Sequence, residues 1–175
     1  SWIAPTPAMS RREAALMVIP MVSMKPSSAR AAGDALGPIA VLGAGGRTGK
    51  LCVEVMRAAG RPAVALSRTE ADVSKASVED LAKAVQGASA VIFAASASSK
   101  GGDSKQVDEQ GAIKAAQACV LAGVPKYVLI SSGGVARPGS LGYAATNWMP
   151  GATWGIMDAK ARGEEGVKAA LRGSK

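Results

Sequence analysis

The stretch Gly37–Ala59 constrains the fold most, because an apolar run, a group of glycines and a helical pattern follow one another directly. The run 39–42 has the length and apolar character of a buried strand. Glycine permits a tight turn and a close approach to a pyrophosphate, whose charge is stabilised at a helix N-terminus. The stretch therefore predicts a nucleotide-phosphate site, with a flexible surface loop as the alternative. The glycines concerned are Gly43, Gly45, Gly46 and Gly49, and a GxGxxG motif would need glycine in place of Thr48.

Strand-like and helix-like segments alternate along the rest of the chain. We expect strands at 39–42, 63–66, 90–95 and 127–130, and a short additional strand at 71–73. A capping box at Ser77 predicts a helix ending at Gly87, and a long helix is expected over Gln106–Ala122. The alternation predicts an α/β fold, a doubly wound and mostly parallel Rossmann sheet with helices on both faces. The residues expected to face inward are Leu51, Val55 and Ala58 in the first helix, and Ile113, Ala116, Val120 and Leu121 in the long helix.

The residues at the end of the second strand bear on which nicotinamide cofactor would bind. In such a sheet the ligand crevice lies at the carboxyl ends of the strands, where an acidic side chain binds the ribose of NAD and an arginine accommodates the 2′-phosphate of NADP. Arg68 stands there, and Arg47 lies in the glycine turn. Two guanidinium groups can share a phosphate dianion, so the sequence predicts NADP(H) rather than NAD(H). Glu70 keeps NAD open, and two solvated surface arginines are the alternative.

Composition excludes several classes of mechanism. The chain has no histidine, so no histidine base or ligand is available, and no metal site is predicted. Cys52 and Cys119 both fall in helical segments, which favours packing over a disulfide; a redox role for Cys52 stays open. The net charge of +8 comes from scattered cations, and only 3% of residues are aromatic, so nucleic-acid binding is not expected. A phosphorylated cofactor, an acidic partner or an anionic membrane surface suits this charge.

Residues 1–37 form a segment separate from the Rossmann domain at 38–175. Ser10-Arg11-Arg12 precedes an apolar run at 14–24, and an Ala-x-Ala ending follows. This pattern is typical of an export signal with paired arginines, and the run is shorter than the roughly 20 residues needed to span a bilayer. It resembles the thylakoid-targeting part of a plastid transit peptide, which would place the protein in a chloroplast. The alternative is an N-terminal extension that lies against a partner.

The chain from about residue 38 onward resembles the atypical short-chain dehydrogenase/reductase family, of NmrA-like and plastid NAD(P)-binding type. The matching segments are AVLGAGGRTGK, ALSR, ADVSKASVEDLAKAVQGASAVIFAAS, VDEQGAIKAAQACVLAGVPKYVLISSGG and KARGEEGVKAALRGS. The resemblance implies that Asp72 and Val73 border the adenine. It further implies that Ala94, Ala95 and Ser96 border the adenine-side ribose and the pyrophosphate, and that Ser131 and Ser132 lie near the nicotinamide.

The sequence departs from this family where catalysis is expected. Reductases of the superfamily use a serine and a tyrosine four residues before a lysine, which tunes the tyrosine for proton transfer. The best-aligned lysine is Lys160, but Ile156 stands four residues before it, and Tyr143 is followed at the same spacing by Asn147. Ser132, Tyr143 and Lys160 are therefore the catalytic candidates of an incomplete relay. Lys160 is also a candidate to bind the nicotinamide ribose, with an exposed helical lysine as the alternative.

Three functions remain open from the sequence. The first is an NADP(H)-binding protein with a degenerate relay, which acts as a nucleotide-sensing or accessory subunit of a thylakoid complex. The second is an active NADPH-dependent reductase or isomerase, and the third is a structural subunit with an empty crevice. Family members continue past Glu164-Glu165 into a further strand and a substrate-binding portion, whereas this sequence ends at Lys175. The unpaired sheet edge that this would leave is expected to be covered by a partner or by the N-terminal segment.

Overall fold

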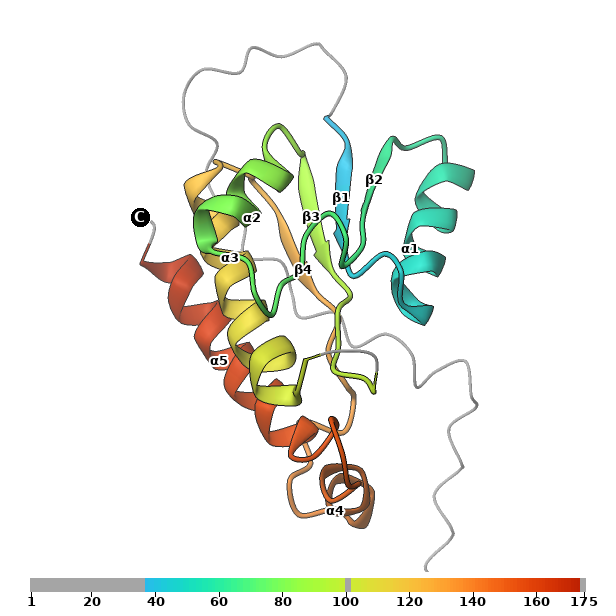
Figure 1. The fold of residues 1–175 in the computed structure, drawn as a ribbon, viewed down its shortest axis with the longest axis vertical. Helices are drawn as coiled ribbons and strands as arrows, with labels where there is room; N and C mark the ends of the chain where they lie inside the picture. The colour runs from blue at the N-terminus through green and yellow to red at the C-terminus, as the bar shows by residue number, and fades with distance from the viewer. Residues whose placement is uncertain (1–36, 100–101, 174–175) are drawn as a thin grey trace, which may run out of the picture.

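The computed structural model describes residues 37–99 and 102–173 as a sheet flanked by helices (Figure 1). Its four strands are all parallel and lie in the order β2-β1-β3-β4. The apolar runs of the sequence form them because strands buried on both faces need continuous hydrophobic side chains. The strands are β1 (Ile39–Leu42), β2 (Ala63–Leu66), β3 (Ala90–Phe93) and β4 (Tyr127–Leu129).

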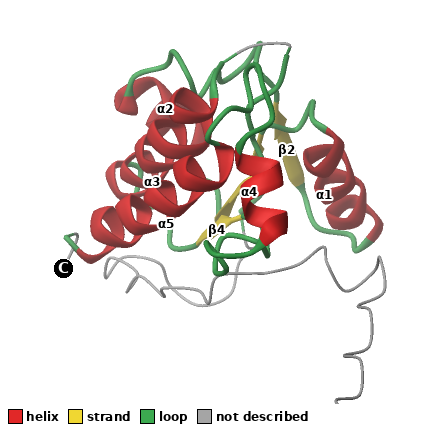
Figure 2. Cartoon of the chain, turned by 90° about the horizontal axis from the view of Figure 1, so that it is seen from below, coloured by secondary structure: helices red, strands yellow, loops and turns green. Residues whose placement is uncertain are grey.

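The helices cover both faces of this sheet, as the sequence predicted. Helices α2, α3 and α5 pack against one another on one face, whereas α1 contacts β1 and β2 on the other (Figures 1 and 2). Helix α4 lies beyond the carboxyl end of the sheet (Figure 1). The helices are α1 (Arg47–Ala58), α2 (Val78–Val85), the π-helix η2 (Lys105–Gly111), α3 (Ala112–Leu121), α4 (Leu141–Asn147) and α5 (Ile156–Arg172).

The strand order places a topological switch point beside β1. The chain leaves β1 toward β2 on one side and then returns to β3 on the other, with Leu42 paired to both Leu66 and Phe93. In open α/β sheets, ligands bind at the carboxyl ends of the strands where the order reverses in this way. The main core lies on the side of α2 and α3 and includes the fully buried Phe93 and Leu81.

The inward face expected for α1 was wrong. Leu51 and Val55 are 60% and 59% exposed, whereas Gly49 and Val53 are buried. A Cβ on Gly49 would lie 2.2 Å from the Gly43 carbonyl oxygen, so α1 rests on the turn through its backbone. Gly49 and Val53 are four residues apart and therefore share a helix face. The pattern of apolar residues did not predict this buried face because one of its two residues is a glycine.

Two other local predictions were also wrong. Residues 71–73 form no strand; Ala71 and Val73 are buried, while the Asp72 side chain accepts hydrogen bonds from the Ser74 amide and hydroxyl and closes a turn. The long helix expected over Gln106–Ala122 is present as η2 followed by α3, but Leu121, expected to face inward, is 60% exposed. Ala116, also expected to face inward, is buried with the other alanines of α3, because α3 packs between α2 and α5.

Candidate dinucleotide-binding site

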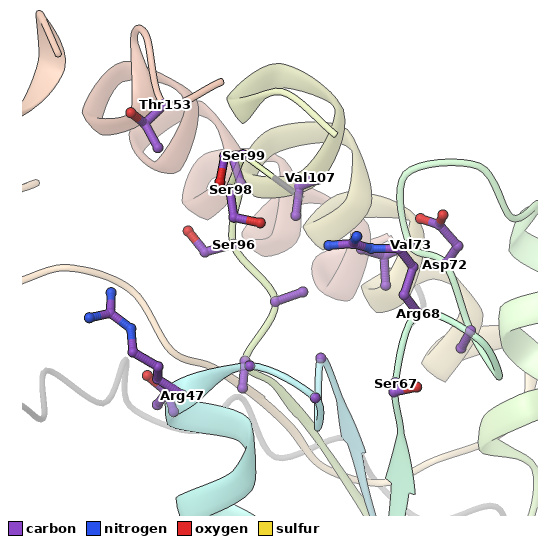
Figure 3. A pocket seen from close by; sticks show the side chains of 18 of the residues that line it. Arg47, Ser67, Arg68, Asp72, Val73, Ser96, Ser98, Ser99, Val107 and Thr153 are labelled. Atoms are coloured by element: carbon purple, nitrogen blue, oxygen red, sulfur yellow. The ribbon is translucent and has the colours of Figure 1, made fainter. Parts of the chain in front are cut away.

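A cavity of about 700 Å³ opens at the switch point (Figure 3). This volume lies in the range of small-molecule and cofactor sites. Segments that follow β1, β2 and β3 line it, because the carboxyl ends of parallel strands meet at one edge of the sheet. The predicted cofactor-binding residues that line it are Gly43, Gly45, Gly46, Arg47, Thr48, Arg68, Asp72, Val73, Ala94, Ala95 and Ser96.

The glycine turn after β1 is shaped by two close backbone contacts. Gly43 has a φ of +82°, and a Cβ on it would lie 2.6 Å from the backbone of Ala95. Gly49 does not line the cavity but allows α1 to pack on the turn. Gly45 lines the cavity without a side chain, and a Cβ added to it would lie 3.4 Å from the Cβ of Ser67. The turn thus exposes backbone, not side chains, to a ligand.

Helix α1 presents an uncapped N-terminus to this turn. Its N-cap is Gly46, which has no side-chain acceptor, and its first turn holds no acidic residue. Arg47 and Thr48, the first two residues of the helix, line the cavity. Backbone N–H groups at a helix N-terminus attract anions, and the helix dipole adds to this attraction. The chemistry of these donors fits the diphosphate of a dinucleotide.

The end of β2 forms a compact hydrogen-bonded turn. The Glu70 carboxylate accepts hydrogen bonds from the Ser67 amide at 2.8 Å and the Ser67 hydroxyl at 2.5 Å, and these bonds lower the pKa of Glu70. The Thr69 amide donates to the Ser67 hydroxyl at 3.3 Å, as in a capping box. The turn holds Arg68 at the cavity, on the opposite side of the glycine turn from Arg47 (Figure 3).

Asp72 lies close to Arg68 at this side of the cavity. Partial burial acts to raise the pKa of Asp72, but hydrogen bonds from Ser74 and the positive charges of Lys75 and Arg68 outweigh it and hold the pKa below its usual value. The carboxylate is therefore charged at neutral pH. A cation and an anion stand together where the adenosine half of a dinucleotide is expected.

A hydrogen-bonded group lies behind the segment that follows β3. The Asp108 carboxylate accepts from the Ser96 hydroxyl at 2.7 Å, the Ala97 amide at 2.8 Å and the Lys160 ammonium at 2.6 Å. Lys160, predicted to hold the nicotinamide ribose, does not line the cavity; it forms an ion pair with Asp108. Asp108 was not among the residues predicted for the site; its one signal in the sequence is a carboxylate on the inward side of a helical segment.

The other catalytic candidates also lie outside the cavity lining. The Tyr143 hydroxyl donates to Asp158, and this bond, with some burial, raises the pKa of Tyr143. The Ser132 hydroxyl accepts from the Gly134 amide at 3.4 Å. The Ser131 hydroxyl, a predicted cofactor contact, donates to Glu164 at 2.5 Å. The structure therefore does not bring Ser132, Tyr143 and Lys160 together around the cavity.

Several residues that line the cavity were not predicted as cofactor contacts, although Ser67 stands at a strand end that the sequence placed at the crevice. They come from the end of β2, the segment after β3, helix η2, the loop before α5 and the first residue of α5. No spacing rule places such loops, because their position depends on how the helices pack. These residues are Ser67, Ala71, Ala97, Ser98, Ser99, Val107, Thr153 and Ile156.

Residues 43–170 match the family model described as NAD(P)H-binding. The chain belongs to this NAD(P)H-binding family. The match covers the glycine turn, the ends of β2 and β3 and most of helix α5, which agrees with the fit of the turn to a diphosphate. Nicotinamide dinucleotide binding, predicted from the sequence, is thus supported by the family as well as by the geometry.

Relatives of this NAD(P)H-binding protein include the UPF0659 protein YMR090W of Saccharomyces cerevisiae, which is 30% identical over an alignment of length 113; the match covers 54% of this chain and 50% of the yeast protein. Two similar solved structures are MoeE5 with UDP-glucose and NAD, and dTDP-4-dehydrorhamnose reductase of Bacillus anthracis with NADP. Their TM-scores are 0.54 and 0.51 and their identities 23% and 17%; the alignments cover 77% and 79% of this chain and 49% and 51% of theirs. The chain spans about half the length of these relatives. The likeness confirms the Rossmann-type fold.

In residues 37–99 and 102–173, no group of three or more Cys, Asp or Glu side chains is arranged to hold a metal ion. None of the helices in those same ranges combines the length and the apolar character that a bilayer crossing requires. The proposed transit segment at 1–37 and its cleavage lie almost entirely outside the described residues.

Proposed function

We propose that this NAD(P)H-binding protein binds NADP(H) in preference to NAD(H) and acts as a nucleotide-responsive accessory subunit, not as a reductase. The observation that carries the proposal is that the groups suited to bind a dinucleotide line the cavity, whereas the groups suited to catalysis do not. The cavity is lined by a glycine turn, an uncapped helix start and two arginines. The tyrosine and lysine that a reductase would need are hydrogen-bonded to carboxylates outside that lining.

The preference for NADP(H) rests on Arg68. Its side chain lines the cavity directly after β2, where the 2′-position of the adenosine ribose is expected. Glu70, the residue that would favour NAD, has its carboxylate bound to the Ser67 amide and hydroxyl. Because Arg47 and Arg68 project on opposite sides of the glycine turn, we assign the diphosphate to Arg47 and the 2′-phosphate to Arg68 (Figure 3).

The absence of reductase activity rests on Tyr143 and Lys160. A general acid must reach the reacting group and have a pKa near the working pH. The Tyr143 hydroxyl instead donates to Asp158, and its pKa is raised. Lys160 is held by the buried Asp108 and has Ile156, not tyrosine, four residues before it. Such a site supports binding of the dinucleotide, and among the described residues that line it there is neither a tyrosine nor a lysine.

A role in a thylakoid complex is the finer part of this proposal. It is motivated by the paired arginines and apolar run of residues 10–24 and by the net charge of +8, which suits an acidic partner or anionic surface. The prediction is that the protein co-fractionates with a membrane-bound assembly of the chloroplast. Recovery of the protein free and monomeric in stroma would contradict it.

The cofactor preference is tested by titrating the protein with NADPH and NADH and following nicotinamide fluorescence. We expect NADPH to bind more tightly, and Arg68→Ala to weaken NADPH by about tenfold or more while changing NADH little, because one charge-assisted contact is lost. Arg57→Ala, at the far end of α1, is the matched control. Equal affinities for the two cofactors, or an unchanged affinity in Arg68→Ala, would contradict the assignment.

The lack of reductase activity is tested by NADPH consumption with a panel of carbonyl compounds. We expect no turnover above the background of a Gly43→Ala variant, whose cavity is altered. Turnover that disappears in Tyr143→Phe would instead establish the active reductase as the function. That result would leave the cofactor preference untouched.

A further inference from the structure

Asp108 is a buried carboxylate whose partners come from different parts of the fold. Its side chain is 0% exposed, and it accepts three hydrogen bonds, from Ser96, Ala97 and Lys160. The first two partners belong to the segment after β3, and the third belongs to α5. Charged side chains are rarely buried to this extent unless they are paired. Asp108 therefore joins the cavity wall to α5.

The backbone around Asp108 is arranged to make this junction. It lies in η2, and short π-helical segments are frequent at functional sites. A Cβ on Gly163 would lie 2.3 Å from the Asp108 carbonyl oxygen, so α5 touches η2 through its backbone. Lys160 stands three residues before Gly163 on the same side of α5. The close packing brings its ammonium group to the buried carboxylate.

The residues that Asp108 holds form part of the cavity lining. Ser96, Ala97 and the neighbouring Val107 all line the cavity, whereas Asp108 and Lys160 stand behind it. Asp108 thus has no direct route to a ligand. Asp108 can therefore affect ligand binding only by fixing the position of the Ser96–Ala97 segment. The preceding residue, Ala95, lies against Gly43 of the glycine turn.

We propose that Asp108 is a positioning residue of the dinucleotide site, which fixes the Ser96–Ala97 wall and depends on Lys160 for its charge balance. The proposal rests on the dinucleotide binding proposed above. Removal of Lys160 leaves a buried carboxylate without its cation, and removal of Asp108 frees the wall. Both changes displace the same segment, so their effects on binding are not independent.

The test is a double-mutant cycle read as the affinity for NADPH. We expect Asp108→Asn and Lys160→Met each to lower the affinity for NADPH by about tenfold. The double variant should also lose only about tenfold, because the effects of two coupled residues do not add. Glu109→Gln is the matched control, since it removes the adjacent carboxylate, which pairs with Arg162 outside the cavity. We expect its affinity to equal that of the wild type.

A conservative variant separates positioning from general damage to the fold. Lys160→Arg keeps a cation beside Asp108, so we expect it to bind NADPH much more tightly than Lys160→Met does. Equal losses in Lys160→Arg and Lys160→Met, additive losses in the double variant, or an unchanged Asp108→Asn would overturn the proposal. The two Lys160 variants also give this comparison where Asp108→Asn does not fold. Failure of the wild type to bind NADPH would overturn the proposed function itself.

Discussion

Replacing Gly43 by alanine tests whether the glycine turn is held by contact with the segment after β3. Gly43 and Gly60 both have positive φ values, +82° and +68°. An added Cβ at Gly60 meets nothing within 4 Å, whereas at Gly43 it would lie 2.6 Å from the Ala95 backbone. The two substitutions therefore share the cost of a left-handed backbone and differ in the clash. Gly60→Ala is the matched control.

The magnitudes follow from these two terms. A left-handed alanine costs about 1–2 kcal/mol, and forcing an extra carbon into a packed site costs about 1–3 kcal/mol more. We expect Gly60→Ala to lower the free energy of unfolding by about 1 kcal/mol, after the gain from a less flexible unfolded chain. Gly43→Ala should lower it by about 2–4 kcal/mol and abolish measurable NADPH binding.

The assay is denaturant unfolding followed by circular dichroism, with NADPH titration of each folded variant. Equal m-values would show that the same folded structure is compared. The reasoning would be refuted if the two variants lost the same stability, since the turn would then not touch the Ala95 backbone. Tight NADPH binding by Gly43→Ala would refute the role of the turn as the diphosphate site.

Three further predictions concern a cap, a carboxylate and a thiol. Ser77→Ala should destabilise the fold by about 1 kcal/mol in the same unfolding assay, because the Ser77 hydroxyl caps α2 by accepting from the Asp80 amide; an unchanged free energy of unfolding would contradict this. Hydrogen bonds from Tyr143 and Asn147 lower the pKa of Asp158, so it stabilises the fold above its unfolded pKa and loses this effect as pH falls through the folded value. Unfolding at pH 7 and at acid pH should therefore show a smaller pH dependence in Asp158→Asn, and an unchanged dependence would contradict this. Burial raises the pKa of Cys119 to about 12, so mass spectrometry should find it alkylated only after denaturant is added, whereas half-buried Cys52 should react first; rapid native labelling of Cys119 would count against its burial.

The sequence by itself determined the architecture and the place of the site. Continuous apolar runs such as 39–42 make sense only as buried parallel strands, and Gly43 to Gly49 mark the turn between the first strand and its helix. These features are local, because the turn needs backbone freedom at fixed positions and the strand needs side chains of one kind. The fold class and the position of the glycine turn were therefore predictable from the sequence alone.

Tertiary packing decided which faces are buried and which polar groups meet. The pattern put Leu51 and Leu121 inside, but α1 packs through Gly49 and α3 is enclosed by two helices. The ion pair of Asp108 with Lys160 joins residues 52 apart in the sequence, and it exists because Gly163 lets α5 approach η2. A glycine that allows close packing because it has no side chain leaves no periodic signal in the sequence. The same is true of ion-pair partners that helix packing brings together, so these contacts follow only from the three-dimensional arrangement.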